Sequence, residues 1–313
     1  MTDSKETVAI VIPVFNEEHV LPELLARLGA LLAANGDCAW RVVFVDDGSR
    51  DRSAELIRAQ AAADPRFELV ELSRNFGFQS ALSAGLARAA GADAAVTMDA
   101  DLQDPPELIP KLVAAWRSGA EVVRAVRASR SETGLRRLGF DLFHSLYGRL
   151  TDIPVESNTG TFGLLGRPAL EAFAQLPERN RFFPGLRAWI GFPTADVAYD
   201  RQGRAAGKPK QTLRRLVRYA VDGFFSFSYL PLRFLTYSGV LVSLLGFILG
   251  LYFIVKRLLG IETASTGFTT LVSLVTFLGG IQLIGIGVLG EYLGRVYDEV
   301  KQRPIYIVRP PRR

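Results

Sequence analysis

Cysteine and histidine are scarce in this sequence of 313 residues: Cys38 is its single cysteine, and His19 and His144 are its only histidines. A single cysteine excludes an intramolecular disulfide, and without a Cys-x-x-Cys pair or a histidine cluster nothing points to zinc. We therefore interpret Cys38 as a small filler in the core and both histidines as structural residues.

Two long segments in the C-terminal third contain no Lys, Arg, Asp or Glu. They run from Phe234 to Val255 and from Phe268 to Gly290. As helices with a rise of about 1.5 Å per residue, each would be about 33 Å long, enough to cross a hydrocarbon core of about 30 Å. A buried helix pair in a globular protein is the alternative, but such helices normally keep a polar stripe. The sequence predicts two transmembrane helices.

Basic residues flank the two segments on their outer sides. Four precede the first segment and six follow the second: Arg214, Arg215, Arg218 and Arg233, then Arg295, Lys301, Arg303, Arg309, Arg312 and Arg313. Only Lys256 and Arg257 lie between the segments, so the positive-inside rule places both termini in the cytoplasm. The N-terminal residues "MTDSKETVAIVIP" show no signal peptide. The net charge of +5 and the pI near 9.4 then indicate attraction to anionic lipids rather than to nucleic acid.

Residues 1–130 alternate short β-branched runs with helix-like stretches. The runs are "VAIVIPV", "RVVFVDD", "FELVELS", "DAAVTMD" and "EVVRAV". Continuous apolar strands that alternate with helices are typical of a mostly parallel sheet covered on both faces. The sequence therefore predicts an α/β fold, in which ligands bind beyond the carboxyl ends of the strands.

Three of the predicted strands end in polar clusters, "PVFNE" (13–17), "VDDGS" (45–49) and "MDADLQ" (98–103). A single acidic turn is usually only a helix cap, but three clusters at one sheet edge favour a binding site. Asp99, Asp101 and Gln103 supply hard oxygen ligands that suit Mg²⁺ or Mn²⁺, metals that share their coordination shell with substrate phosphates. We expect a cation and a diphosphate at this edge.

The motifs in their order resemble a known family over essentially the whole chain. They are "VIPVFNE", "VDDGSRD", "LSRNFGFQSALSAGL", "MDADLQDPPE", "ERNRFFPGLRAWIGF", "YDRQGRAAGKPK" and "FSFSYLPLR", followed by the two apolar segments. Together they resemble the polyprenyl-phosphate glycosyltransferases of glycosyltransferase family 2, relatives of dolichyl-phosphate mannose synthase and bacterial bactoprenyl glucosyltransferases. The resemblance implies a Rossmann-like GT-A nucleotide-sugar-binding domain with interfacial helices and two C-terminal transmembrane helices.

The resemblance also implies roles for individual residues. Those matched to nucleotide-sugar binding are Pro13, Phe15, Glu17, Val45, Asp46, Asp47, Gly48, Ser49, Asn75, Gly77, Asp99, Ala100 and Asp101. Those matched to the metal are Asp99, Asp101 and Gln103, and those expected to act in catalysis are Asp99, Asp101, Arg127, Arg204 and Lys210. Thr161, which departs from the family pattern, is also expected to take part. Each group has a plainer alternative: Asp46 as the cap of a helix starting near Arg50, Phe15 as core, and Arg127 and Arg204 as solvated surface charges.

One motif departs from the family pattern. Where most relatives have "GDFRL", this chain has "GTFGL" at 160–164, so a carboxylate often proposed as the catalytic base and an arginine are both missing. The expected acceptor is a phosphate, whose second pKa of about 6 leaves it largely dianionic at pH 7. Such a nucleophile needs no strong base, so we expect activity, with Thr161 helping to orient groups by hydrogen bonding.

We expect four parts in the chain: a cytoplasmic glycosyltransferase domain at 1–211, a juxtamembrane amphipathic helical segment at 212–233, two transmembrane helices at 234–293, and a basic cytoplasmic tail at 294–313. The juxtamembrane segment groups arginines ahead of an aromatic stretch, as in helices at a membrane interface, although a simple connector is the alternative. Gly246 and Gly250, and Gly290 and Gly294, have the spacing that lets helices approach closely. We expect one of these faces to pack a helix of the same or a neighbouring chain, the latter giving a homo-oligomer.

The implied function is metal-dependent, inverting transfer of a sugar from a nucleotide sugar, with UDP as the preferred base, to a polyprenyl phosphate such as undecaprenyl phosphate. The expected location is the bacterial inner (plasma) membrane. Two alternatives remain. A non-catalytic sugar-nucleotide-binding scaffold is one, and a processive polysaccharide synthase is the other, although "GLRAW" lacks the Gln of the Gln-x-x-Arg-Trp motif that such synthases carry.

Overall fold

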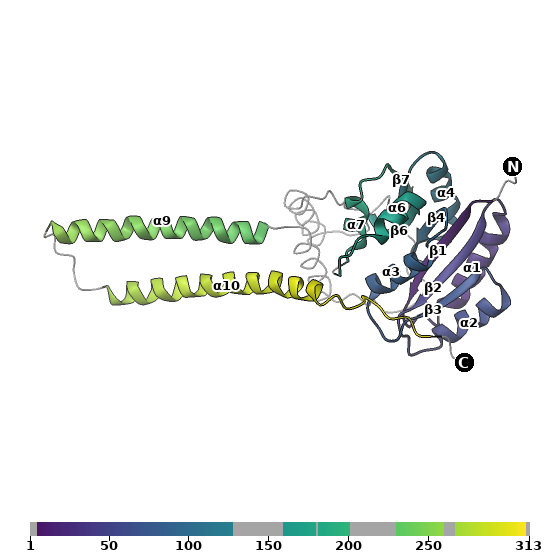
Figure 1. Ribbon diagram of the computed structural model, residues 1–313, viewed down its shortest axis with the longest axis horizontal. Coiled ribbons are helices and arrows are strands. Elements are labelled where there is room, and N and C mark those ends of the chain that lie inside the picture. The colour runs from purple at the N-terminus through teal and green to yellow at the C-terminus, as the bar shows by residue number, and fades with distance from the viewer. Residues whose placement is uncertain (1–4, 128–158, 180, 201–229, 260–266, 311–313) are drawn as a thin grey trace. The chain divides into compact units, whose positions relative to one another are not determined.

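The computed structural model describes residues 5–127, 159–179, 181–200, 230–259 and 267–310. These residues divide into two units (Figure 1). The first contains all the described strands, helices α1, α2, α3, α4, α6 and α7, and residues 303–310, and the second contains helices α9 and α10. Arg204, Lys210, His144 and most of the juxtamembrane segment lie outside the described residues.

The first unit is built on a seven-stranded sheet in the order β3-β2-β1-β4-β6-β5-β7. Its strands are β1 (Thr7–Val14), β2 (Ala39–Asp46), β3 (Phe67–Glu71), β4 (Ala94–Thr97), β5 (Val122–Arg127), β6 (Thr159–Gly166) and β7 (Thr194–Tyr199). Strands β3, β2, β1 and β4 are parallel, whereas β6 runs antiparallel to both β4 and β5. The expected α/β fold is confirmed, and the sheet is mixed.

Helices cover both faces of this sheet. They are α1 (Leu21–Ala34), α2 (Ser53–Ala63), α3 (Phe78–Arg88), α4 (Ile109–Arg117), α6 (Arg167–Ala174) and α7 (Phe183–Trp189), with a short 3₁₀ turn at Pro106–Leu108. Successive residues of β2 alternate between the faces: Phe44 belongs to the core beneath α1, α2 and α4, and Val45 to the one beneath α3. A Cβ added at Gly85 would lie 2.2 Å from a methyl of Val11, so this glycine lets α3 lie close to the sheet.

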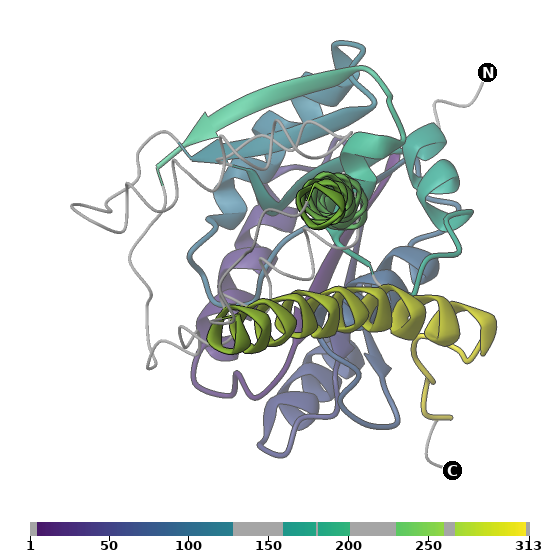
Figure 2. The ribbon, with the colours of Figure 1, turned by 90° about the vertical axis from the view of Figure 1, so that its left-hand side faces the viewer.

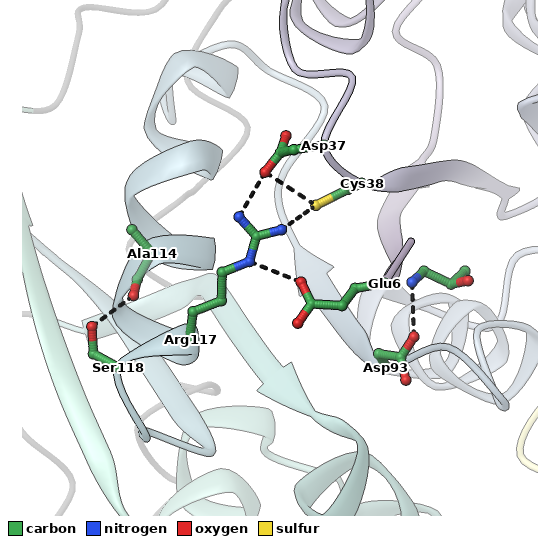
Figure 3. A network of polar contacts seen from close by, with 8 residues as sticks. Glu6, Asp37, Cys38, Asp93, Ala114, Arg117 and Ser118 are labelled. Carbon is green, nitrogen blue, oxygen red and sulfur yellow. Dashed lines mark hydrogen bonds and ion pairs between the residues drawn. The ribbon is translucent and has the colours of Figure 1, made fainter. Parts of the chain in front are cut away.

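A polar network ties together the amino ends of the strands, opposite the predicted site (Figure 3). Arg117, at the end of α4, donates to Glu6 at 2.8 Å, to Asp37 at 2.6 Å and to the sulfur of Cys38 at 3.1 Å. Cys38 is buried, as expected of a small core residue. This edge of the sheet is thus occupied by paired charges.

The second unit consists of α9 (Leu230–Leu258) and α10 (Phe268–Val300), the latter a continuous helix (Figure 2). Within the described ranges one helical stretch, Phe277–Val300, is long and apolar enough to cross a membrane, and α9 holds a shorter apolar stretch, Phe234–Leu249. Length and composition therefore support one span in α10. The second span, in α9, stays a prediction.

Residues 303–310 return to the first unit and extend its sheet at β3. Ser73 N donates to Ile307 O at 2.8 Å, and Arg309 N donates to Glu71 O at 2.7 Å. Leu72 and Val308 form an antiparallel bridge. The basic segment at the end of the chain therefore has defined backbone pairing, which neither its charge nor its composition predicts.

Candidate active site

The residues that follow β1, β2 and β4 lie along one edge of the sheet. Strand β1 pairs with β2 on one side and with β4 on the other, and all three are parallel. Their carboxyl ends therefore bring together the segments that begin at Phe15, Asp47 and Met98. This is the edge at which the sequence places the site, and the opposite edge carries the Arg117 network.

The loops after β1 and β2 are linked to each other through hydrogen bonds. Asn16, which has a left-handed φ of 54°, donates its amide to Ser49 Oγ at 3.0 Å and accepts from Arg50 N at 2.8 Å through Oδ1. The preceding Phe15 is 38% exposed, so the alternative of a core side chain is wrong. An exposed aromatic ring held on a fixed loop can stack on a planar ligand.

Asp46 and Asp47 are both buried, and burial raises the pKa of each carboxyl. Asp47 accepts hydrogen bonds from Phe76 N at 2.7 Å and Gly77 N at 2.9 Å, so it joins the end of β2 to the start of α3. Asp46 accepts from Ser49 N at 3.2 Å. It does not cap a helix, because α2 begins only at Ser53, and the capping alternative is wrong.

Gly48 is required by a close backbone approach. Its φ is +72°, and a Cβ there would lie 2.7 Å from the carbonyl carbon of Arg74 and 2.8 Å from Asn75 N. The exposed Asn75 is thereby held next to the end of β2. Pro13, Val45 and Ala100, also predicted to contact nucleotide sugar, are buried, so a ligand could reach them chiefly through backbone atoms.

The loop after β4 presents Asp99 and Asp101, both partly exposed. Thr161 Oγ1 donates to Asp99 Oδ1 at 3.1 Å, and Gln103 N donates to Asp101 Oδ1 at 3.2 Å. Leu102 between them has a left-handed φ of 57°, which turns the chain sharply. Thr161 therefore touches the predicted metal site directly.

The oxygen donors of this loop fit a hard divalent cation. Within the described ranges, no group of three His, Cys, Asp or Glu side chains could hold a metal. Asp99, Asp101 and Gln103, the predicted ligands, offer only oxygen donors, unlike the closed sulfur and imidazole cages of structural zinc. Mg²⁺ and Mn²⁺ suit such a set, because they complete their shells with water and phosphate oxygens.

Arg127, at the end of β5, is partly buried rather than a freely solvated charge. A Cβ at Gly160 would lie 3.1 Å from its Nη2, so its guanidinium lies against the start of β6, next to Thr161. The neighbouring Tyr199 hydroxyl donates to Asp104, which is 1% exposed. Burial and the Asp104 charge raise the pKa of Tyr199 well above its usual range, which keeps the hydroxyl protonated.

Arg187 on α7 is a second cation that sequence reasoning missed. Its side chain is 3% exposed, and its Nη2 donates to Gly160 O at 3.2 Å. A Cβ at Gly163 would lie 3.0 Å from its Nη1. Burial, followed by the charge of Arg124, lowers the pKa of Arg187 to about 10, so it stays charged at neutral pH. The glycine that departs from the family pattern leaves room for this guanidinium.

Two known protein families match separate parts of this chain. Residues 9–173 match the description "Glycosyl transferase family 2" and residues 230–296 match "GtrB C-terminal hairpin". The structure of glucosyl-3-phosphoglycerate synthase from Mycobacterium tuberculosis with Mn²⁺, UDP and phosphoglyceric acid has a TM-score of 0.49 and 21% identity, over 71% of this chain and 78% of that one.

Two curated relatives are more similar. A glycosyltransferase of Synechocystis sp., described as uncharacterized, is 44% identical over 96% of this chain and 94% of its own length. The SfII prophage-derived bactoprenol glucosyl transferase of Shigella flexneri is 40% identical over 98% of both chains. Identity at this level over nearly the full length, together with the match at residues 9–173, shows that the chain belongs to glycosyltransferase family 2 and is a glycosyltransferase.

Proposed function

We propose that the protein transfers a sugar from a nucleotide sugar, with UDP as its nucleotide, to a polyprenyl phosphate in the membrane, with inversion at the anomeric carbon. The main support for this proposal is that Phe15, the acidic pair Asp46 and Asp47, and the loop from Asp99 to Asp101 lie at the same edge of the sheet. Relatives named bactoprenol glucosyl transferases support a lipid acceptor of this class.

The nucleotide sugar would lie across the strand ends. The exposed ring of Phe15 is placed to stack on the base. Asp46 is largely buried and already accepts from Ser49 N, and it is proposed to accept a further hydrogen bond from the nucleoside. Asp99, Asp101 and Gln103 would hold a divalent cation, which supplies positive charge to the departing nucleoside diphosphate. Arg127 adds a fixed positive charge beside β6. Arg204 and Lys210, which lie outside the described residues, are proposed to add further positive charge.

In the proposed reaction, an oxygen of the lipid phosphate forms a bond to the anomeric carbon while the bond from that carbon to the nucleoside diphosphate breaks. The leaving diphosphate keeps the electron pair. Because the phosphate is already an anion, the carboxylate missing at Thr161 is not required to remove a proton. The threonine instead donates to Asp99 and adds no negative charge beside an anionic acceptor.

A lipid acceptor implies contact with the membrane. Two spans are supported by the apolar stretch Phe277–Val300, by the apolar part of α9 and by the match to a C-terminal hairpin at residues 230–296. We propose the division of the chain expected from the sequence, with parts at 1–211, 212–233, 234–293 and 294–313. The flanking basic residues support cytoplasmic termini in a bacterial inner membrane. The protein would then act on a cytoplasmic sugar nucleotide and a lipid of the inner leaflet.

The test uses membranes that contain the full chain, undecaprenyl phosphate and a panel of labelled nucleotide sugars. We expect label to appear in the lipid with at least one UDP-sugar, and to be lost in excess chelator and in Asp101→Asn. Asp64→Asn, at the opposite end of the sheet, is the matched control, since Asp64 pairs only with Arg66 among the described residues and lies before β3. Tight nucleotide binding without turnover for any sugar would instead favour the scaffold function.

A further inference from the structure

Tyr199 is a buried tyrosine at the end of β7 that touches three separate parts of the proposed site. Its side chain is 7% exposed, and its hydroxyl donates to Asp104 Oδ1. In the parallel pairing of β5 with β7, its partner is Arg127. Its ring meets that of Phe162 edge-on, with the centroids 5.8 Å apart and the planes at 88°.

The first of these parts is the acidic loop. Asp104 follows Asp101 by three residues, and the turn between them is formed by the left-handed Leu102 and the hydrogen bond from Gln103 N to Asp101. A carboxylate as buried as Asp104 is costly unless hydrogen bonds satisfy it. The hydrogen bond from the Tyr199 hydroxyl therefore fixes Asp104, at the C-terminal end of the turn that contains Asp101.

The other two parts carry Arg127 and Thr161. Arg127 is the register partner of Tyr199 in the parallel pairing of β5 with β7, and Phe162, which the ring contacts, directly follows Thr161. Thr161 in turn donates to Asp99. One side chain thus joins the loop of Asp101, the strand of Arg127 and the strand of Thr161, although sequence separations of up to 95 residues divide them.

We propose that Tyr199 is a positioning residue of the sugar-transfer site, holding the acidic loop in register with Arg127 and Thr161 through its bond to Asp104. This inference rests on the proposed function. A hydroxyl that only filled the core would affect stability alone. A hydroxyl that fixes the turn at Asp101 affects how strongly the site holds its cation, because a loosely held ligand set must be ordered on binding.

Tyr199→Phe is the cleanest variant, since it removes one oxygen and keeps the ring against Phe162. We expect Mn²⁺ affinity, measured by calorimetry on the full-length protein in the presence of UDP, to fall about tenfold, the size expected for losing a hydrogen bond to a charged group. Turnover at saturating nucleotide sugar should fall as well. Tyr237→Phe, which removes a hydroxyl from an exposed side chain on α9, should leave both quantities unchanged.

A double-mutant cycle with Asp104→Asn separates positioning from general weakening. If the two groups act through their mutual hydrogen bond, the double variant loses little more Mn²⁺ affinity than either single variant. The proposal is overturned if Tyr199→Phe lowers the Tm yet keeps wild-type Mn²⁺ affinity, or if the two losses multiply. Absence of lipid transfer in the wild type would refute the proposed function only, because the Mn²⁺ measurement still decides the role of Tyr199.

Discussion

Replacing Thr161 by alanine removes the hydroxyl that donates to Asp99 Oδ1 at 3.1 Å. The chain has this threonine where most of its relatives are expected to have an aspartate. If Thr161 only orients Asp99, its loss weakens the site without abolishing the reaction. We therefore expect Thr161→Ala to remain active, in contrast to Asp101→Asn.

The magnitude follows from the contact. A hydrogen bond to a charged group is worth about 1.5–3 kcal/mol when buried, and because both Thr161 and Asp99 are partly exposed, about 1 kcal/mol is the better figure here. That energy corresponds to a loss of about fivefold in kcat/KM. Asp101→Asn removes a charge from the proposed cation site itself, and we expect a loss of more than about a hundredfold.

The assay is transfer of labelled sugar to undecaprenyl phosphate, with kcat and KM determined for each variant. Thr161→Ser keeps the hydroxyl and should retain near wild-type activity, whereas Thr161→Val keeps the shape without the donor and should match Thr161→Ala. Equal losses in Thr161→Ala and Asp101→Asn would refute a merely orienting role. Wild-type activity in Thr161→Val would show that the hydrogen bond to Asp99 does not matter.

Three further predictions concern the surroundings of the site. Gly48→Ala should lower the free energy of unfolding by at least about 1 kcal/mol in urea titrations and weaken UDP binding, because its φ is +72° and a Cβ would meet Arg74. Arg187→Met should change that free energy by less than about 1 kcal/mol, since a buried cation is costly, while turnover falls severalfold as the contact with Gly160 is lost. Deleting residues 303–310 should lower the free energy of unfolding by about 2 kcal/mol, the worth of two backbone hydrogen bonds, and raise KM for the nucleotide sugar.

The central strands of the sheet and the polar clusters at their carboxyl ends are predictable, because both depend on local sequence pattern. The run "VAIVIPV" is apolar on both faces, and such a run can only be a central strand between two helical layers. The direction of β6 is not predictable in this way. The residues "TGTFGLLG" are compatible with either a parallel or an antiparallel strand, and its direction is determined only by its pairing with both β4 and β5.

The positions of Asp99 and Asp101 follow from the sequence, whereas their supporting contacts do not. Tyr199 and Asp104 are 95 residues apart, and a single tyrosine at a strand end has no periodicity that would identify its partner. Arg187 was missed for a related reason, since an arginine is normally a surface residue. The signal that could have found it is the small residue at Gly163, which leaves a space that some other side chain must fill.

Because residues 303–310 pair next to β3, this edge of the sheet can be completed only late in synthesis. Arg309 and its contact at Ser73 are 236 residues apart, and α9 and α10 are translated between them. The edge of β3 therefore emerges from the ribosome long before its partner does, and it stays unpaired while the apolar helices are being made. Open strand edges invite pairing with other chains. A glycosyltransferase domain expressed alone, ending at residue 211, would keep that open edge permanently, so adding back the peptide 303–310 should reduce its aggregation.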